Sequence, residues 1–306
     1  MNNEKKLVSI IIPTYRRPST LERAIDSALN QEYSPIEIIV VDDNNPNTED
    51  RLATEQVMKK YEHFENVKYI QHPCNRNGSA ARNTGARNAK GEFYCFLDDD
   101  DEYFPQKIKM QVERLEQLDS SWGICYCKYI RKRGNRIVSK SAEKREGWIA
   151  FHELCRNFWH GGGSGPLVRK DVFWSVGGFD ERFKRNQDYE YMLKITKRYK
   201  IAFVDVLGMA IYVDSFHEKQ TSYYQILQNF LDTFKKDIDE LESDPKKKFY
   251  QMIALQTIRY ELLEKHSIKQ CIIIKNKNKV SFFLLTRYLI YLFYRKLFKV
   301  SVGFNI

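Results

Sequence analysis

The sequence has 306 residues, of which 42% are hydrophobic and 29% are charged. A chain of this length can bury a sizeable core, and its apolar content excludes a small stapled scaffold and global disorder. The net charge of +10 alone would suggest a nucleic acid or an anionic membrane as partner. However, residues 1–242 contain 37 basic and 37 acidic residues, whereas residues 243–306 contain 13 and 3. We therefore expect no nucleic acid partner for the main domain and an anionic contact for the tail.

Strand and helix patterns alternate along the first hundred residues. The expected strands are 7–12, which ends at Pro13, then 36–41, 67–70 and 92–97, and the expected helices are 18–30, about 48–61 and 78–89. Apolar strands separated by helices are typical of parallel βαβ units that are covered on both faces. Residues 1–105 therefore look like a nucleotide-binding half-domain, in which ligands bind beyond the carboxyl ends of the strands.

The pattern changes after residue 105. A second half, 106–222, is expected to contain a helix to about 118, a hairpin of strands 123–131 and 137–140, a strand 166–169, a helix from 171 and a helix 187–198. The glycine-rich loop 160–165, with Ser164, either shapes a subsite for an acceptor or is a plain connection. Residues 223–306 predict a basic helical extension, interrupted at Asp244 and Pro245, with a solvated connector at 275–279.

The six cysteines indicate a reducing compartment. None of them forms a CxxC pair, so the sequence predicts reduced packing thiols and no zinc or redox site. The apolar run 7–12 is too short for a secretion signal and predicts a buried strand. Together these features favour the cytoplasm.

Residues 98–101 are four consecutive aspartates at the end of an apolar strand. Such carboxylates repel each other unless a cation or hydrogen-bond donors compensate them. Mg²⁺ or Mn²⁺ would do so, since both prefer oxygen ligands that they share with substrate phosphates. A solvated turn that caps the next helix is the alternative. Asp42 and Asp43 end another strand, where by themselves they are equally compatible with a turn former or an N-cap. Their place at the same sheet edge as the four aspartates makes them candidates for binding a base or a ribose.

Four segments of the chain together resemble a known family. Residues 8–17, 39–43, 78–92 and 96–101 resemble, in order and spacing, the inverting family 2 glycosyltransferases, and later elements extend the likeness to about 222. The resemblance implies an α/β fold of the GT-A type, with a Rossmann-like, mostly parallel sheet flanked by helices and a helical C-terminal extension. It also implies transfer of a sugar from a nucleoside diphosphate donor, usually a UDP-sugar, with inversion at the anomeric carbon.

The resemblance further implies roles for single residues. Around the nucleoside it places Pro13, Thr14, Tyr15 and Asp43, with Asp42 beside them. Arg82 would face the donor, and Asp99 would contact its ribose or sugar. Asp98 and Asp100 match the carboxylates that hold Mn²⁺ or Mg²⁺. His217 resembles a loop histidine that reaches the metal or the pyrophosphate, although a surface or core histidine is equally compatible with the sequence.

Inversion in one step requires a base that removes the proton of the acceptor hydroxyl. Members of the family carry an acidic dipeptide on a helix after a Gly-Gly-Phe-Asp turn. Here the turn is 177–180, so Asp188 takes the place of the base and Gln187 stands where the family commonly has Glu. Glu190 is the second candidate. A purely structural alternative is that Asp188 only stabilises the first turn of the helix.

The tail 280–298 is aromatic and basic. Arg287 in its middle would cost about 2.5–3.5 kcal/mol at a bilayer centre, which argues against a spanning helix. A helix lying on an anionic membrane surface fits better, and packing on the protein or on a partner chain is the other alternative.

These features favour a metal-dependent inverting glycosyltransferase at the inner face of the cell membrane. Its acceptor would be a glycan or a lipid-linked glycan in the synthesis of a surface or capsular polysaccharide. A nucleotidyltransferase is a rival, but it would need a glycine-rich phosphate loop after the first strand, and residues 13–17 contain no glycine. A non-catalytic membrane- or nucleic-acid-binding module is the other rival, and the confinement of the charge excess to residues 243–306 counts against it.

Overall fold

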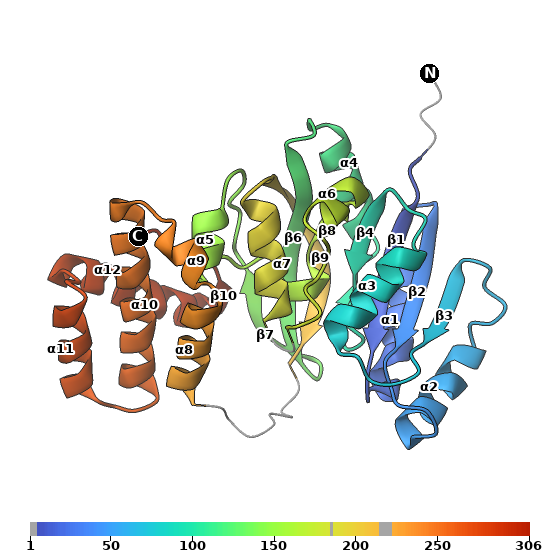
Figure 1. Ribbon diagram of the computed structural model, residues 1–306, viewed down its shortest axis with the longest axis horizontal. Coiled ribbons are helices and arrows are strands. Elements are labelled where there is room, and N and C mark those ends of the chain that lie inside the picture. Colours follow the sequence, from blue (N-terminus) through green and yellow to red (C-terminus); the bar gives the residue numbers. More distant parts are fainter. Residues whose placement is uncertain (1–4, 184–185, 214–221) are drawn as a thin grey trace. The chain divides into compact units, whose positions relative to one another are not determined.

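The computed structural model describes residues 5–183, 186–213 and 222–306, so His217 lies outside the described residues. The chain divides into two compact units (Figure 1). The first comprises Met1–Ile149 and Trp159–Asp214, and the second comprises Ala150–Phe158 and Ser215–Ile306. The division of the chain at 105 and 222 stays a prediction.

The first unit contains a mixed sheet and its helices. The strands are β1 (Val8–Thr14), β2 (Ile36–Asp42), β3 (Val67–Gln71), β4 (Phe93–Phe96), β5 (Glu102–Tyr103), β6 (Trp122–Arg133), β7 (Arg136–Ser141), β8 (Leu167–Arg169) and β9 (Lys200–Tyr212). The helices are α1 (Pro18–Leu29), α2 (Glu49–Lys59), α3 (Gly78–Asn88), α4 (Lys107–Glu116), α6 (Lys170–Ser175) and α7 (Gln187–Thr196), with a 3-10 turn η1 at Gly162–Ser164.

The sheet of the first unit has a parallel half and a mixed half (Figure 1). Strands β3, β2, β1 and β4 lie side by side in that order and run parallel. β8 pairs antiparallel with β4 and β6, β7 pairs antiparallel with β6, and β9 runs parallel to β6. The parallel half confirms the βαβ units predicted for the first hundred residues, and the antiparallel pair β6–β7 confirms the predicted hairpin.

Helices cover both faces of the parallel half. Ile10 and Ile12 of β1 belong to the core that contains Ile25 of α1, whereas a Cβ on Gly85 of α3 would lie 2.3 Å from Cγ2 of Ile11. Successive side chains of a strand point to opposite faces, so α1 and α3 lie on opposite sides of β1. The close approach of α3 to the sheet brings its N-terminus to the edge at which β1, β2 and β4 end.

Strand β1 does not end at Pro13, as the sequence predicted, but includes it. The carbonyl of Ile11 accepts a hydrogen bond from the N–H of Leu97 at 2.9 Å, so the backbone polar groups of Ile11 point toward the β4 side. Those of residue 13 point the same way, but the pairing of β1 with β4 ends at Ile11. The missing N–H of proline therefore breaks no ladder there. Strands β5 and β9 were not predicted, because β5 has only two residues and register shifts against β6 interrupt the regular alternation of β9.

The second unit is largely helical, which confirms the predicted extension. It contains α5 (Ala150–Leu154), α8 (Tyr223–Thr233), α9 (Lys235–Asp239), α10 (Ser243–Leu263), α11 (Ile268–Lys277), α12 (Phe282–Phe298) and a short β10 (Val300–Ser301). Pro245 does not interrupt a helix but lies in the first turn of α10, where proline is tolerated. The expected connector at 275–279 is partly wrong as well, since α11 continues to Lys277. Among the described residues, no helix combines the length and apolarity that crossing a membrane requires.

Candidate active site

The acidic turn 98–101 meets the segment that follows β1. The backbone N–H of Tyr15 donates to Asp99 at 3.3 Å, and the guanidinium of Arg17 contacts Asp99 at 3.2 Å and Asp100 at 2.6 Å. Asp99 is buried, and this burial raises its pKa to about 7, although the nearby charge of Arg17 acts in the opposite direction. Arg17 therefore compensates part of the negative charge that this turn concentrates.

Arg82 compensates the first carboxylate of the turn. It comes from α3, forms an ion pair with Asp98 and lies 5.6 Å from the ring centroid of Phe179. The Arg82 residue is only 8% exposed, whereas the side chain of Asp98 is 33% exposed. Within the described residues, Nε of Arg82 has no hydrogen-bond partner. A buried cation with an unused donor beside an accessible carboxylate is an arrangement suited to an anionic ligand.

Asp101, in contrast, is held inside the protein. The hydroxyl of Ser164 donates to Asp101 at 2.6 Å and accepts from the N–H of Asp98 at 3.1 Å, while the N–H of Tyr212 donates to Asp101 at 3.2 Å. Burial raises the pKa of Asp101 above its ordinary value, and the charges of Asp98 and Asp100 add to this. The glycine-rich loop therefore fastens the acidic turn through Ser164.

The same loop brings its backbone close to Asp98 and Arg82. A Cβ on Gly163 would lie 3.5 Å from the carboxylate of Asp98 and 3.6 Å from Nη2 of Arg82. A Cβ on Gly165 would lie 1.9 Å from the carbonyl oxygen of His160, so this position requires glycine. The loop is thus a close-fitting part of the site, and its role toward an acceptor stays a prediction.

Asp42 and Asp43 lie at the end of β2, but their oxygens are engaged inside the protein. Asp42 is fully buried and accepts from the Tyr69 hydroxyl at 2.5 Å and from the N–H of Asn44 at 2.8 Å, with Nε of Arg51 at 3.0 Å. Desolvation raises the pKa of Asp42, and the hydrogen bond from Tyr69 opposes this. The geometry therefore favours a supporting position for Asp42 beneath the site.

Asp43 organises the loop that leads to α3. Its carboxylate contacts Nδ1 of His72 at 2.7 Å and accepts from the side chain of Asn75 at 2.8 Å and from the N–H of Asn77 at 2.9 Å. Asn77 in turn caps α3, because its side chain accepts from the N–H of Ser79 at 2.9 Å. Asp43 thereby helps to position the helix that carries Arg82.

The segment Pro13, Thr14 and Tyr15 lies beside these carboxylates. Thr14 is buried and its carbonyl accepts from the N–H of Asp43 at 2.9 Å, whereas Tyr15 is 38% exposed. Sequence reasoning gave no role of their own to Arg17, His72 and Asn77. The rule that residues after parallel strands meet at one edge would have pointed to His72, which follows β3 directly.

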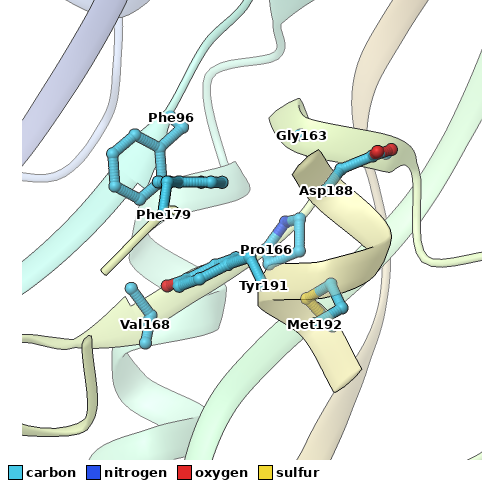
Figure 2. Close-up of a pocket in the computed structure, with 9 residues that line it drawn as sticks. Phe96, Gly163, Pro166, Val168, Phe179, Asp188, Tyr191 and Met192 are labelled. Carbon is cyan, nitrogen blue, oxygen red and sulfur yellow. The ribbon is translucent and has the colours of Figure 1, made fainter. Parts of the chain in front are cut away.

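Asp188 lies in the first turn of α7 and lines a pocket in the first unit (Figure 2). The other lining residues are Phe96, Gly162, Gly163, Pro166, Val168, Phe179, Tyr191 and Met192. Figure 2 shows the carboxylate of Asp188 beside the segment of Gly163 and directed away from the aromatic rings. Because Gly163 adjoins both Asp98 and this pocket, the loop connects the acidic turn with Asp188.

The surroundings of Asp188 and Glu190 differ. Across the part of the chain that the structure describes, the side chain of Asp188 makes no hydrogen bond or ion pair, and most of its neighbours in the pocket are apolar. Glu190 pairs with Lys194 at 2.9 Å, and Lys194 also donates to the carbonyl of Gly178 at 2.8 Å. Burial raises the pKa of Glu190, and the charge and hydrogen bond of Lys194 oppose this. Glu190 is thus occupied in holding the 177–180 turn.

The donor set of the acidic turn fits a hard divalent cation. Asp98 and Asp100 offer oxygen ligands, and their side chains are 33% and 20% exposed. No three His, Cys, Asp or Glu side chains among the described residues are grouped to hold a metal by themselves. Mg²⁺ often takes only one or two carboxylates and completes its shell with water and substrate phosphates, so two partly exposed aspartates meet its requirement.

Comparison with known sequences gives a consistent result. Residues 9–177 match the family model described as Glycosyl transferase family 2. An uncharacterized glycosyltransferase of Rickettsia felis is 34% identical over 222 residues, which are 71% of this chain and 35% of the relative. The UDP-Glc:alpha-D-GlcNAc-diphosphoundecaprenol beta-1,3-glucosyltransferase WfgD of Escherichia coli is 28% identical over 201 residues, 65% of this chain and 73% of the relative. The chain spans only about a third of the Rickettsia felis protein.

Comparison with solved structures supports the fold. S. aureus TarS 1–349 in complex with UDP-GlcNAc superposes with a TM-score of 0.63 at 18% identity, over 93% of this chain and 78% of TarS. The mannosyltransferase PcManGT of Pyrobaculum calidifontis, in complex with GDP-Man and Mn²⁺, gives 0.55 at 16% identity, over 97% and 88%. The predicted α/β fold of the GT-A type with a helical C-terminal region is confirmed.

Proposed function

Because the chain belongs to glycosyl transferase family 2, we propose that it transfers a sugar from a nucleoside diphosphate donor to an acceptor hydroxyl with inversion. One observation carries this proposal. Gly163 adjoins the Asp98–Arg82 pair and also lines the pocket of Asp188, so groups suited to a diphosphate and a base lie on either side of one loop.

We assign the diphosphate of the donor to Asp98, Asp100 and Arg82. A Mg²⁺ or Mn²⁺ held by the two aspartates would supply positive charge for the departing diphosphate. Arg82 adds a buried guanidinium whose Nε lacks a partner among the described residues and can donate to a phosphate oxygen. The complex of PcManGT with Mn²⁺ supports the choice of cation.

The nucleoside is assigned to the segment Pro13, Thr14 and Tyr15, with Asp43 holding the loop beside it and Asp99 reaching the ribose or the sugar. Tyr15 exposes part of its ring, which offers a stacking surface for a base. UDP-sugars are the preferred donors in this proposal, since WfgD carries UDP-Glc in its name and TarS binds UDP-GlcNAc.

Asp188 is assigned to the acceptor. A carboxylate without a hydrogen-bond or ion-pair partner among the described residues, in a pocket with several apolar side chains, is available to take the proton of a hydroxyl that attacks the anomeric carbon. Glu190 is less suited, since Lys194 already engages it. His217 remains a proposed contact of the metal or pyrophosphate and lies outside the described residues.

We propose a glycan or lipid-linked glycan as acceptor, in the synthesis of a surface or capsular polysaccharide at the cytoplasmic face of the cell membrane. The name of WfgD, which includes a diphosphoundecaprenol-linked sugar, supports a lipid-linked acceptor. The six cysteines, all of which are free, support a reducing compartment.

The test is the release of nucleoside diphosphate from a panel of UDP-, GDP- and dTDP-sugars with Mn²⁺, with Mg²⁺ or with a chelator. We expect cation-dependent release from a UDP-sugar by the parent protein and loss of that release in Asp100→Ala. Asp171→Ala, which removes an exposed carboxylate at the start of α6, is the matched control and should behave like the parent. If no donor of the panel releases nucleoside diphosphate and calorimetry detects no nucleotide binding, the proposal is refuted. Release of pyrophosphate would indicate nucleotidyl transfer instead.

A further inference from the structure

Helix α12 of the second unit turns an apolar stripe toward solvent. Phe282 is 78% exposed, Ile290 63%, Phe293 67% and Leu297 60%. At 3.6 residues per turn these side chains fall on one side of the helix, and the exposed Leu289 lies beside them. A surface helix of a globular protein normally has the opposite arrangement, with its apolar stripe toward the core.

The opposite side of α12 is anchored, so the outward orientation of the stripe is built into the second unit. Tyr288 is buried and its ring lies 5.2 Å from that of Phe304. The hydroxyl of Tyr291 donates to the carbonyl of Val302 at 2.7 Å, and Nε of Arg295 donates to the carbonyl of Val300 at 3.2 Å. These contacts determine which face of α12 points outward.

Basic side chains accompany the exposed apolar ones. Lys296 and Arg287 are exposed on the two flanks of the stripe. Helix α11 has no buried residue and exposes Ile268 and Ile272 together with Lys269. Residues 243–306 contain 13 basic and 3 acidic residues, so a complementary partner has to be anionic as well as apolar.

We propose that the outward face of α12 binds the interface of an anionic lipid bilayer. The stripe would enter the boundary between headgroups and acyl chains, and the flanking cations would stay among the lipid phosphates. Helix α12 has 17 residues and carries Arg287 within it, and no described helix is long and apolar enough to cross a membrane, so in this proposal α12 lies in the plane of the membrane. The inference deepens the proposed function and rests on it for the use of a lipid-linked acceptor.

The test is co-sedimentation of the full chain with phosphatidylcholine vesicles, with and without phosphatidylglycerol. We expect binding that depends on phosphatidylglycerol and weakens at high salt. The double variant Ile290→Ser/Phe293→Ser should lower the partition coefficient at least about tenfold, because two apolar side chains leave the interface. Leu52→Ser, which changes a 54% exposed leucine of α2 in the first unit, is the control and should bind like the parent.

Two results would overturn the inference. One is equal sedimentation of the parent and of the double variant, provided that circular dichroism shows both to be folded. The other is absence of binding combined with concentration-dependent dimers that the double variant abolishes, since a second copy of the chain would then cover the stripe. Nucleotide release is assayed without vesicles, so a failure of membrane binding is distinguishable from a failure of the proposed transferase activity.

Discussion

The contacts of each carboxylate in the candidate site indicate whether it remains available to a ligand. Buried carboxylates have to be compensated by donors or cations, and Asp42, Asp43 and Asp101 receive this compensation from within the protein. Asp98 and Asp100 remain partly exposed and paired with guanidinium groups. The first and third of the four aspartates are therefore the ones that we propose to hold a cation beside the substrate phosphates.

The proposed role of Asp188 as the base can be tested by a single substitution. In Asp188→Asn the amide cannot accept the acceptor proton, so transfer should fall by about 10²–10⁴-fold. Donor binding, measured by calorimetry, should change little because the proposed diphosphate contacts are intact. Glu190→Gln is the control, and its transfer rate should stay near that of the parent because Glu190 is engaged with Lys194. Parent-like transfer by Asp188→Asn would exclude this residue as the base.

Secondary-structure elements hold the site through close backbone approach. Helix α3 packs on β1 at a position where only glycine fits, and this brings Arg82 to the acidic turn. The loop around η1 fastens the same turn from the other side through Ser164. The first contact requires a residue without a Cβ at position 85, whereas the second is made by the hydroxyl of Ser164.

A pair of glycine substitutions tests this packing. Gly85→Ala should lower the free energy of unfolding, because its Cβ would overlap Ile11 at 2.3 Å. Such overpacking costs about 1–3 kcal/mol, which exceeds the gain of about 1 kcal/mol in helix propensity. Gly163→Ala is the matched control, since its Cβ would make only ordinary contacts at 3.5 Å, and its stability should stay within about 0.5 kcal/mol of the parent. Urea denaturation measures both, and equal midpoints for the two variants would contradict the packing argument.

The two proposed interaction sites lie in different units of the molecule. All described residues assigned to the donor and to the base belong to the first unit, whereas the exposed stripe of α12 belongs to the second. The basic excess lies within residues 243–306. The two proposed interactions therefore involve different parts of the chain.

Hydrogen exchange followed by mass spectrometry should separate the two interactions. UDP with Mn²⁺ should slow exchange in peptides that cover residues 13–17 and 98–101 and should leave α12 unchanged. Anionic vesicles should slow exchange in α12, because the membrane restricts local opening and access to water there. Vesicles of phosphatidylcholine alone serve as the control. Protection of α12 by the nucleotide alone would contradict the separation of the two sites.

The sequence by itself determined the parallel half of the sheet, the placement of acidic residues at the ends of β2 and β4 and the helical extension. These features follow from local periodicity and from the rule that parallel strands end at a common edge. Only the tertiary structure decided that Asp42 and Asp43 are engaged by Tyr69 and His72, that Lys194 holds Glu190 and that α12 exposes its apolar stripe. Such outcomes depend on contacts between segments that are far apart in the sequence, and local sequence patterns do not predict them.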